Sequence, residues 1–186
     1  LIRTIGGILP PTQGRIEVHG RISALLALGV GFNPNLSGRE NVILGGLANG
    51  LSRKQVMDRA EEIADFSELD DFMDLPIRTY SSGMRSKLAF AVSVHMDPDI
   101  LMIDEALSAG DAAFRKKAAV KMKELMESAR AMFLVSHALG SVKELCNKAI
   151  WIDKGRLMME GEPDAVIKAY TKFLEVGEDA FSLEDL

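Results

Sequence analysis

Residues 100–105 have the sequence Ile-Leu-Met-Ile-Asp-Glu and decide the fold that we expect for this chain. Four apolar residues that follow a proline-containing turn and end at two carboxylates are typical of a strand buried on both faces. Ligands of open α/β sheets gather at the carboxyl ends of the strands, so Asp104 and Glu105 are placed for a metal ion and an attacking water molecule. The pair alone is weak evidence, because acidic dipeptides commonly begin solvated loops.

Strands and helices alternate around this stretch. We expect two short strands joined by a turn within residues 14–28, helices over residues 40–48, 52–66, 69–72, 80–96, 112–129, 140–146 and 163–174, a second buried strand over residues 132–135, and a hairpin of strands 149–153 and 156–160. This order predicts an α/β fold with a parallel sheet, an inserted helical subdomain at about residues 38–79 that continues into the helix of residues 81–96, and a small antiparallel β portion.

Composition excludes several classes of protein. The 186 residues are 47% hydrophobic and 26% charged, which fits one globular domain over residues 1–186 with a loose acidic tail at residues 175–186. A net charge of −5 with dispersed acids gives no support for a nucleic-acid partner. The single cysteine, Cys146, excludes an intrachain disulfide. No stretch approaches the roughly 18 apolar residues of a membrane span, so we expect no direct span.

Two further motifs each allow two interpretations. Ser81-Ser82-Gly83 precede an amphipathic helix, where a serine is a common N-cap. Free backbone N–H groups, two hydroxyls and the positive end of a helix dipole also form an anion site, and phosphate is its natural ligand. His137, at the end of the second buried strand, fits either a contact to a transferring phosphoryl group or the cap of a turn.

Taken in order, these motifs resemble the nucleotide-binding domain of ABC transporters, which has a P-loop NTPase-like sheet. Tyr80 to Met84 are similar to the family's signature loop, usually Leu-Ser-Gly-Gly-Gln, and differ from it at three of five positions. Residues 100–104 look like the Walker B strand. Asp111 is similar to the D-loop aspartate and His137 to the switch histidine.

The resemblance implies an ATPase with ATP and Mg²⁺ as cofactors. It places the signature residues Ser81, Ser82, Gly83 and Met84 against the γ-phosphate of ATP held by the opposite protomer. Asp104 would hold magnesium through water and Glu105 would polarise the attacking water. His137 would contact the γ-phosphate.

A second implication concerns the Walker A loop. The chain contains no Gly-x-x-x-x-Gly-Lys-Ser/Thr string. Residues 1–9 look like the helix that normally follows that loop. We therefore expect an N-terminally truncated domain that alone binds ATP poorly and is inactive as an ATPase.

The segment Gly29-Val30-Gly31-Phe32 stands where the family has its Q-loop, and the usual glutamine would fall near Ala27-Leu28. With residues 36–41 it resembles the ATPase subunits that export lipid-linked polysaccharides: O-antigen, teichoic acid or actinobacterial cell-wall galactan. The resemblance implies a homodimer bound to an integral-membrane permease subunit, peripheral on the cytoplasmic face of the cell membrane.

Three alternatives remain open. They are the ATPase of a drug or small-molecule exporter, a non-transport ABC ATPase acting on DNA or ribosomes, and a structural α/β module with an inactive site. The sequence does not specify which glycan is exported or whether the chain dimerises by itself.

Overall fold

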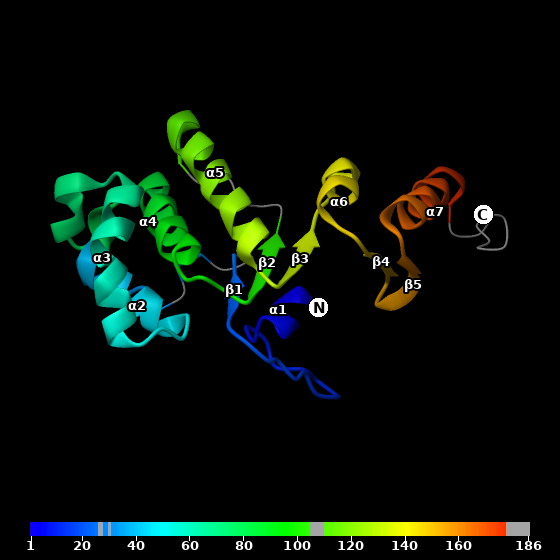
Figure 1. Cartoon of the computed structure of the whole chain (residues 1–186), viewed down its shortest axis with the longest axis horizontal. Coiled ribbons are helices and arrows are strands. Elements are labelled where there is room, and N and C mark those ends of the chain that lie inside the picture. The colour runs from blue at the N-terminus through cyan, green and yellow to red at the C-terminus, as the bar shows by residue number, and fades with distance from the viewer. Residues whose placement is uncertain (26–27, 30, 105–109, 178–186) are drawn as a thin grey trace. The chain divides into compact units, whose positions relative to one another are not determined.

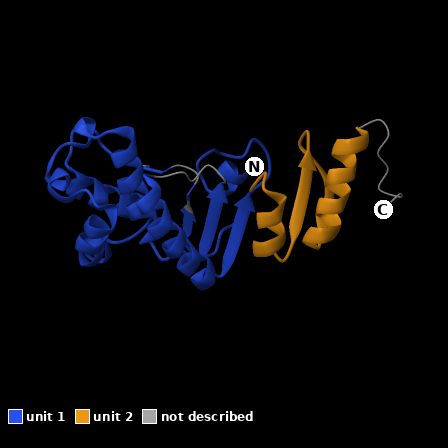
Figure 2. Cartoon of the chain, turned by 90° about the horizontal axis from the view of Figure 1, so that it is seen from above, with its two compact units in different colours: residues 1–135 blue, residues 136–186 orange. Residues whose placement is uncertain are grey.

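The computed structural model describes residues 1–25, 28–29, 31–104 and 110–177 and divides the chain into two compact units, Leu1–Val135 and Ser136–Leu186 (Figure 2). The predicted site residue Glu105 and most of the acidic tail lie outside the described residues. Each unit is considered by itself.

Unit 1 combines a parallel sheet with a helical block (Figure 1). Its elements are α1 (Ile2–Ile5), β1 (Ile22–Ala24), α2 (Gly38–Ala48), α3 (Arg53–Ser67), the 3-10 helices η1 (Asp70–Asp74) and η2 (Ile77–Thr79), α4 (Ser82–Val94), β2 (Ile100–Asp104), α5 (Ala112–Ser128) and β3 (Ala131–Val135). The described strands pair in parallel in the order β1-β2-β3, and Ile100 faces both Ile22 and Ala131. The predicted α/β class with a parallel sheet is confirmed.

The central strand β2 is buried as its sequence predicts, whereas β3 is not. Leu101 and Met102 are fully buried, and the aromatic rings of Phe90 from α4 and Phe114 from α5 pack edge to face over the sheet, 5.9 Å apart. Along β3, exposed and partly buried residues alternate, and Phe133 remains 42% exposed. The expectation of a second fully buried strand was wrong, because β3 is the edge of the described sheet.

The hairpin predicted within residues 14–28 is also wrong. Residues 15–19 form no strand, and residues 22–24 pair with β2 rather than with a preceding segment. The turn residue Gly20 (φ +129°) instead lies against Asp99, whose carboxylate accepts the N–H of Arg21 at 2.9 Å. This long-range contact guides the chain into the sheet and replaces the local pairing that alternation suggested.

The helical block contains the two helices predicted at residues 40–48 and 52–66. Ser37 and Ser52 begin α2 and α3, and each forms a capping box, with Glu40 and Gln55 respectively. A Cβ atom at Gly46 would lie 2.4 Å from a methyl group of Val56, so glycine permits the close approach of α2 and α3. The predicted helix at residues 69–72 is the 3-10 helix η1.

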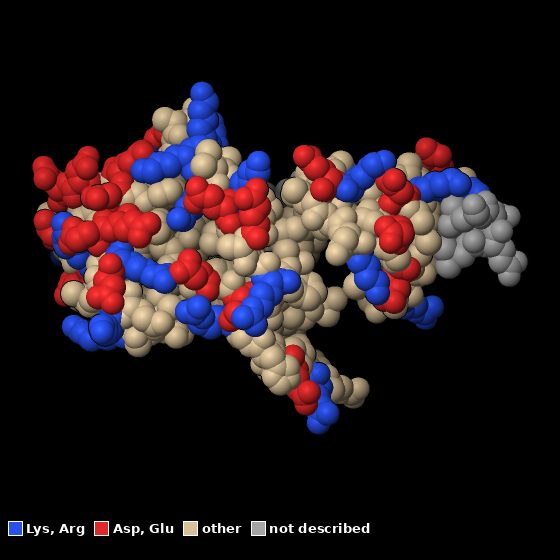
Figure 3. Space-filling model, viewed as in Figure 1, with Lys and Arg blue, Asp and Glu red and all other residues tan. Residues whose placement is uncertain are grey.

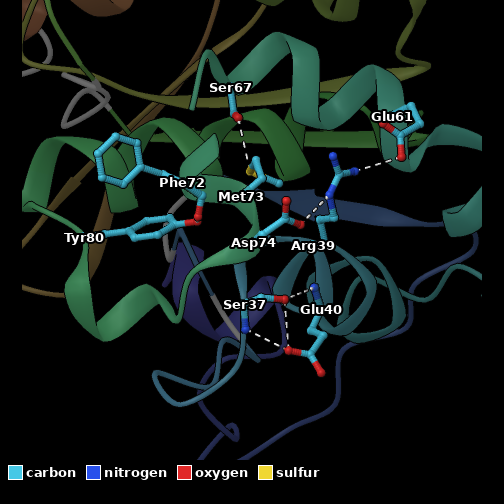
Figure 4. Close-up of polar contacts among 9 residues, drawn as sticks. All are labelled: Ser37, Arg39, Glu40, Glu61, Ser67, Phe72, Met73, Asp74 and Tyr80. Carbon is cyan, nitrogen blue, oxygen red and sulfur yellow. Dashed lines mark hydrogen bonds and ion pairs between the residues drawn. The ribbon is translucent and has the colours of Figure 1, made fainter. Parts of the chain in front are cut away.

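Ionic and polar contacts tie the segments of this block together (Figure 4). The Arg39 guanidinium on α2 binds Glu61 of α3 at 2.8 Å and Asp74 of η1 at 3.0 Å. These pairs are exposed, and they contribute less than the buried apolar residues beneath them, such as Val42 and Ile63.

Unit 2 contains α6 (Leu139–Leu145), β4 (Ala149–Asp153), β5 (Arg156–Gly161) and α7 (Pro163–Val176). β4 and β5 form the predicted antiparallel hairpin. The Trp151 ring contacts Tyr170 and Phe173 of α7, with centroids 5.7 Å and 5.0 Å away. The small antiparallel β portion of the expected fold is therefore confirmed.

We predict that Asn41→Ala lowers the free energy of unfolding by about 2–4 kcal/mol, because it removes four side-chain hydrogen bonds to the backbone and takes from the Asn33 N–H its acceptor. The Asn41 side chain is fully buried; its Oδ1 accepts the N–H of Asn33 at 2.6 Å, and its amide lies 2.8–3.0 Å from the carbonyl oxygens of Asn33, Leu36 and Ser37.

Urea unfolding measures this effect. The exposed Asn35→Ala serves as the matched control and should change stability by less than about 0.5 kcal/mol. If the two variants unfold with equal free energies, the hydrogen bonds of Asn41 to residues 33–37 do not stabilise the protein.

Candidate functional site

A hollow of about 720 Å³ opens on unit 1 at the N-terminal end of α4. Three segments that are distant in sequence line it: residues 68–72, residues 81–87 without Arg85, and the pair Gly110-Asp111. The structure thus brings the predicted signature residues Ser81, Ser82, Gly83 and Met84 to one hollow with the predicted D-loop residue Asp111.

The start of α4 leaves its backbone accessible. The Ser81 hydroxyl accepts the N–H of Met84 at 3.1 Å, so Ser81 is the N-cap, as one of its two interpretations requires. The first N–H groups of a helix have no intrahelical partner, and Ser82 and Gly83 are both exposed. A Cβ atom at Gly83 would meet nothing closer than the Ser81 hydroxyl at 3.8 Å. The loop can therefore approach a ligand closely, and the anion site remains a prediction.

The buried side chain of Tyr80 holds the start of this loop in place. It stands where the family's signature usually has leucine, is 3% exposed, and donates its hydroxyl to the carbonyl oxygen of Phe72 (Figure 4). Burial raises the pKa of its phenol, so the hydroxyl keeps the proton that it donates. A Cβ atom at Gly38 would collide with the Tyr80 hydroxyl, so a glycine at the start of α2 accommodates the tyrosine.

Asp111 uses both carboxylate oxygens within the chain. Its Oδ1 accepts the N–H groups of Ala113 and Phe114 at 3.0 Å each, which makes it the N-cap of α5. Its Oδ2 lies 2.7 Å from the ammonium of Lys87 on α4. The hydrogen bond from Lys87, supported by the backbone N–H groups, lowers the pKa of Asp111 to about 2.

Lys87 and Glu68 are site residues that the sequence analysis missed. The Lys87 side chain is 15% exposed, and its ammonium lies 3.7 Å from the Glu68 carboxylate and 5.1 Å from the centroid of the Phe114 ring. Glu68 also binds Lys117 of α5 at 3.1 Å. One signal was available: Lys87 follows Gly83 by four residues, which places both on one side of the helix.

The structure describes two of the three predicted catalytic or metal-binding residues, Asp104 and His137. Asp104 ends β2, is partly buried, and faces Val135 of β3. Glu105 lies outside the described residues, as does Ala27 of the expected Q-loop position. His137 belongs to unit 2, so its grouping with Asp104 stays a prediction.

The described residues contain no cluster of three or more potential metal ligands. Magnesium usually takes one or two protein carboxylates together with water and phosphate oxygens. Asp104, one carboxylate at the carboxyl end of a central strand, fits that modest requirement.

Acidic side chains surround the loop. In Figure 3 they gather over the helical block, and those that line the hollow are Glu68, Asp70, Asp71 and Asp111. Lys87 is the one basic residue among the described residues of this lining. The described lining therefore carries four carboxylates and one ammonium.

Comparison with solved structures identifies the fold. A solved structure described as the ATP-binding subunit of an ABC transporter superposes with a TM-score of 0.69 at 21% identity, covering 99% of this chain and 79% of that one. A second, described as the dimeric post-hydrolysis state of the ATP-binding cassette MJ0796 with ADP and Pi, gives 0.63 at 20% identity, with 87% and 78% coverage. The fold is that of an ABC-type ATP-binding subunit.

Sequence comparison gives the family. The profile described as ABC transporter matches residues 1–108, and the chain belongs to the ABC transporter family. The O-antigen export system ATP-binding protein RfbB of Myxococcus xanthus is 47% identical over 96% of this chain and 41% of its own length. RfbB of Klebsiella pneumoniae is 42% identical, with 89% and 68% coverage.

The teichoic acids export ATP-binding protein TagH of Lactococcus lactis is also 42% identical, over 94% of this chain and 37% of its own length. The chain thus spans about two fifths of the Myxococcus and Lactococcus relatives.

We predict that acid destabilises the protein through Asp111. Because its pKa is about 2 in the folded protein against 3.8 otherwise, its stabilising contribution is complete at neutral pH and is lost as the pH falls from about 4 through 2. An NMR titration of the carboxyl carbon measures the pKa, and urea unfolding across this range measures stability.

Asp111→Asn should flatten the pH dependence of unfolding between these values. In Lys87→Met the pKa of Asp111 should rise, because the lysine is the largest cause of the shift. A wild-type pKa near 3.8 would contradict the ion pair.

Proposed function

We propose that this chain is part of an ATP-binding and ATP-hydrolysing subunit that powers export of a lipid-linked polysaccharide through a separate membrane subunit. The observation that carries the proposal is the exposed serine loop at the start of α4, held beside Asp111 in a member of the ABC transporter family. The names of the relatives, which export O-antigen or teichoic acids, favour a polysaccharide over a drug as cargo.

The chemistry is transfer of the γ-phosphoryl group of ATP to water. Glu105 accepts a proton as the water oxygen attacks phosphorus, the bond to the β-phosphate oxygen breaks, and ADP and phosphate leave. His137 donates a hydrogen bond to the γ-phosphate. Asp104 would hold Mg²⁺ through water, and the ion would supply positive charge against the phosphate oxygens.

The signature loop acts between two copies of the subunit. Ser81, Ser82, Gly83 and Met84 meet the γ-phosphate of ATP bound to the opposite protomer, and the serine hydroxyls and the first N–H groups of α4 are the donors. The exposure of Ser81, Ser82 and Gly83 supports this role, whereas Met84 is partly buried against the core of the helical block. Two nucleotides then hold a homodimer closed, and hydrolysis releases it.

The membrane partner is a separate permease subunit. None of the described helices is long and apolar enough to cross a bilayer. The helical block of about residues 38–79, continuing into α4, would receive a cytoplasmic segment of the permease. The subunit is thereby held at the cytoplasmic face of the membrane.

The chain alone should bind ATP weakly and be inactive. It has no Gly-x-x-x-x-Gly-Lys-Ser/Thr cradle, and Glu68, Asp70 and Asp71 repel a free polyanion near the loop. Nucleotide is expected at this loop when a second protomer presents it.

We predict that Glu105→Gln in the intact transporter leaves ATP binding unchanged and lowers turnover by about two orders of magnitude or more, since the amide cannot accept the proton. Single-turnover hydrolysis and equilibrium nucleotide binding measure the two effects. Turnover close to that of the wild type would remove Glu105 from the role of general base.

We predict that Ser81→Arg abolishes turnover without weakening nucleotide binding by a separated protomer. An arginine side chain at this exposed N-cap position would fill the space that the γ-phosphate of the partner's ATP needs. It would not contact the nucleotide that the same protomer binds. ATPase assays and binding to monomeric subunit test this. An equal loss of monomer binding would show that the loop does not act across the dimer.

A further inference from the structure

Lys87 joins two loops that the proposed reaction needs at once. Its backbone lies in the first turns of α4, directly after the signature loop, and its ammonium binds the Asp111 carboxylate at 2.7 Å. Asp111 in turn caps α5. One charge-assisted contact therefore links the start of α4 to the start of α5. The two residues that form it are 24 positions apart in the sequence.

The surroundings hold Lys87 in this position. Its stem is largely buried, and its ammonium stands over the face of the fully buried Phe114 ring. A Cβ atom at Gly110 would lie 3.1 Å from the Lys87 side chain and 2.8 Å from the Phe114 ring. Gly110 also has φ +72°, which favours glycine, so the backbone at Gly110 lies close against the lysine.

Glu68 extends the link to the helical block. It ends α3 in the left-handed conformation (φ +55°), a conformation costly for a residue with a side chain. That geometry directs its carboxylate to Lys87 at 3.7 Å and to Lys117 at 3.1 Å. Four alternating charges, Asp111, Lys87, Glu68 and Lys117, thus connect the ends of α3, α4 and α5.

We propose that Lys87 is a positioning residue that couples the signature loop to Asp111 at the start of α5, so that the signature loop and Asp111 are held in place together at the nucleotide of the opposite protomer. Asp111 then acts through Lys87 and the cap of α5, since both of its oxygens already have partners within the chain. This inference rests on the proposed function. It adds a residue on which turnover depends without contact to nucleotide.

Lys87→Met tests the proposal in the intact transporter, because methionine keeps an unbranched apolar stem over Phe114 and removes the charge. We expect kcat for ATP hydrolysis to fall by about ten- to hundredfold, because small displacements of reacting groups lower rates by such factors. The nucleotide affinity of each protomer should stay within about twofold of wild type. Lys87→Arg should restore turnover to within about threefold of wild type.

Lys123→Met is the matched control, since Lys123 is an exposed lysine of α5 whose contact to Glu127 is 4.0 Å long. It should keep wild-type kcat and affinity. Wild-type turnover in Lys87→Met would overturn the proposal. An equal loss of turnover in Lys87→Met and Lys87→Arg, accompanied by an equal fall in Tm, would also overturn it. That outcome would show that Lys87 only stabilises the fold.

A second readout separates this inference from the proposed function. Amide NMR signals of Ser82 and Gly83 in the whole subunit should shift in Asp111→Asn as they do in Lys87→Met, whether or not ATP is hydrolysed. If the wild type fails to hydrolyse ATP, the proposed function is wrong and these shifts still support the coupling. Unshifted signals in Asp111→Asn would overturn the coupling even in an active ATPase.

Discussion

One buried helix, α4, belongs to both hydrophobic cores of unit 1. Leu88 and Val92 pack into the core of the helical block, while Phe90 and Val94 pack into the core beneath the sheet. Every residue from Leu88 to Val94 is buried. Because a buried aliphatic or aromatic side chain contributes about 1.5–3 kcal/mol each, α4 cannot shift against either core without a large loss.

Both ends of α4 are fixed by polar contacts as well. At the C-terminal end, Arg59 of α3 donates to the carbonyl oxygen of His95 at 2.6 Å and binds the Asp97 carboxylate. At the N-terminal end, Tyr80 and Lys87 hold the loop to η1 and to α5. The helix therefore sets the position of the serine loop and, through the turn at residues 97–99, of the strand that ends at Asp104.

The departures from the usual signature sequence have local explanations. In the predicted signature loop, residue 80 is a tyrosine where leucine is usual; its hydroxyl donates to the carbonyl oxygen of Phe72, and Gly38 leaves room for it. A serine at residue 82 remains exposed and adds a hydroxyl to the accessible helix start. The loop is thus packed at Tyr80 and exposed at Ser82 and Gly83, as the proposed contact with a second subunit requires.

The sequence determined the features that depend on neighbouring residues. Capping boxes at Ser37 and Ser52, the apolar run of β2 and the hairpin of β4 and β5 all follow from side chains within a few positions of one another. The alternation of polar and apolar residues within residues 14–28 led to a wrong hairpin prediction, because β1 pairs with β2, which is far along the chain. The tertiary structure alone decided that Lys87, Glu68 and Asp111 meet, since their contacts exist only after α3, α4 and α5 pack around Phe114.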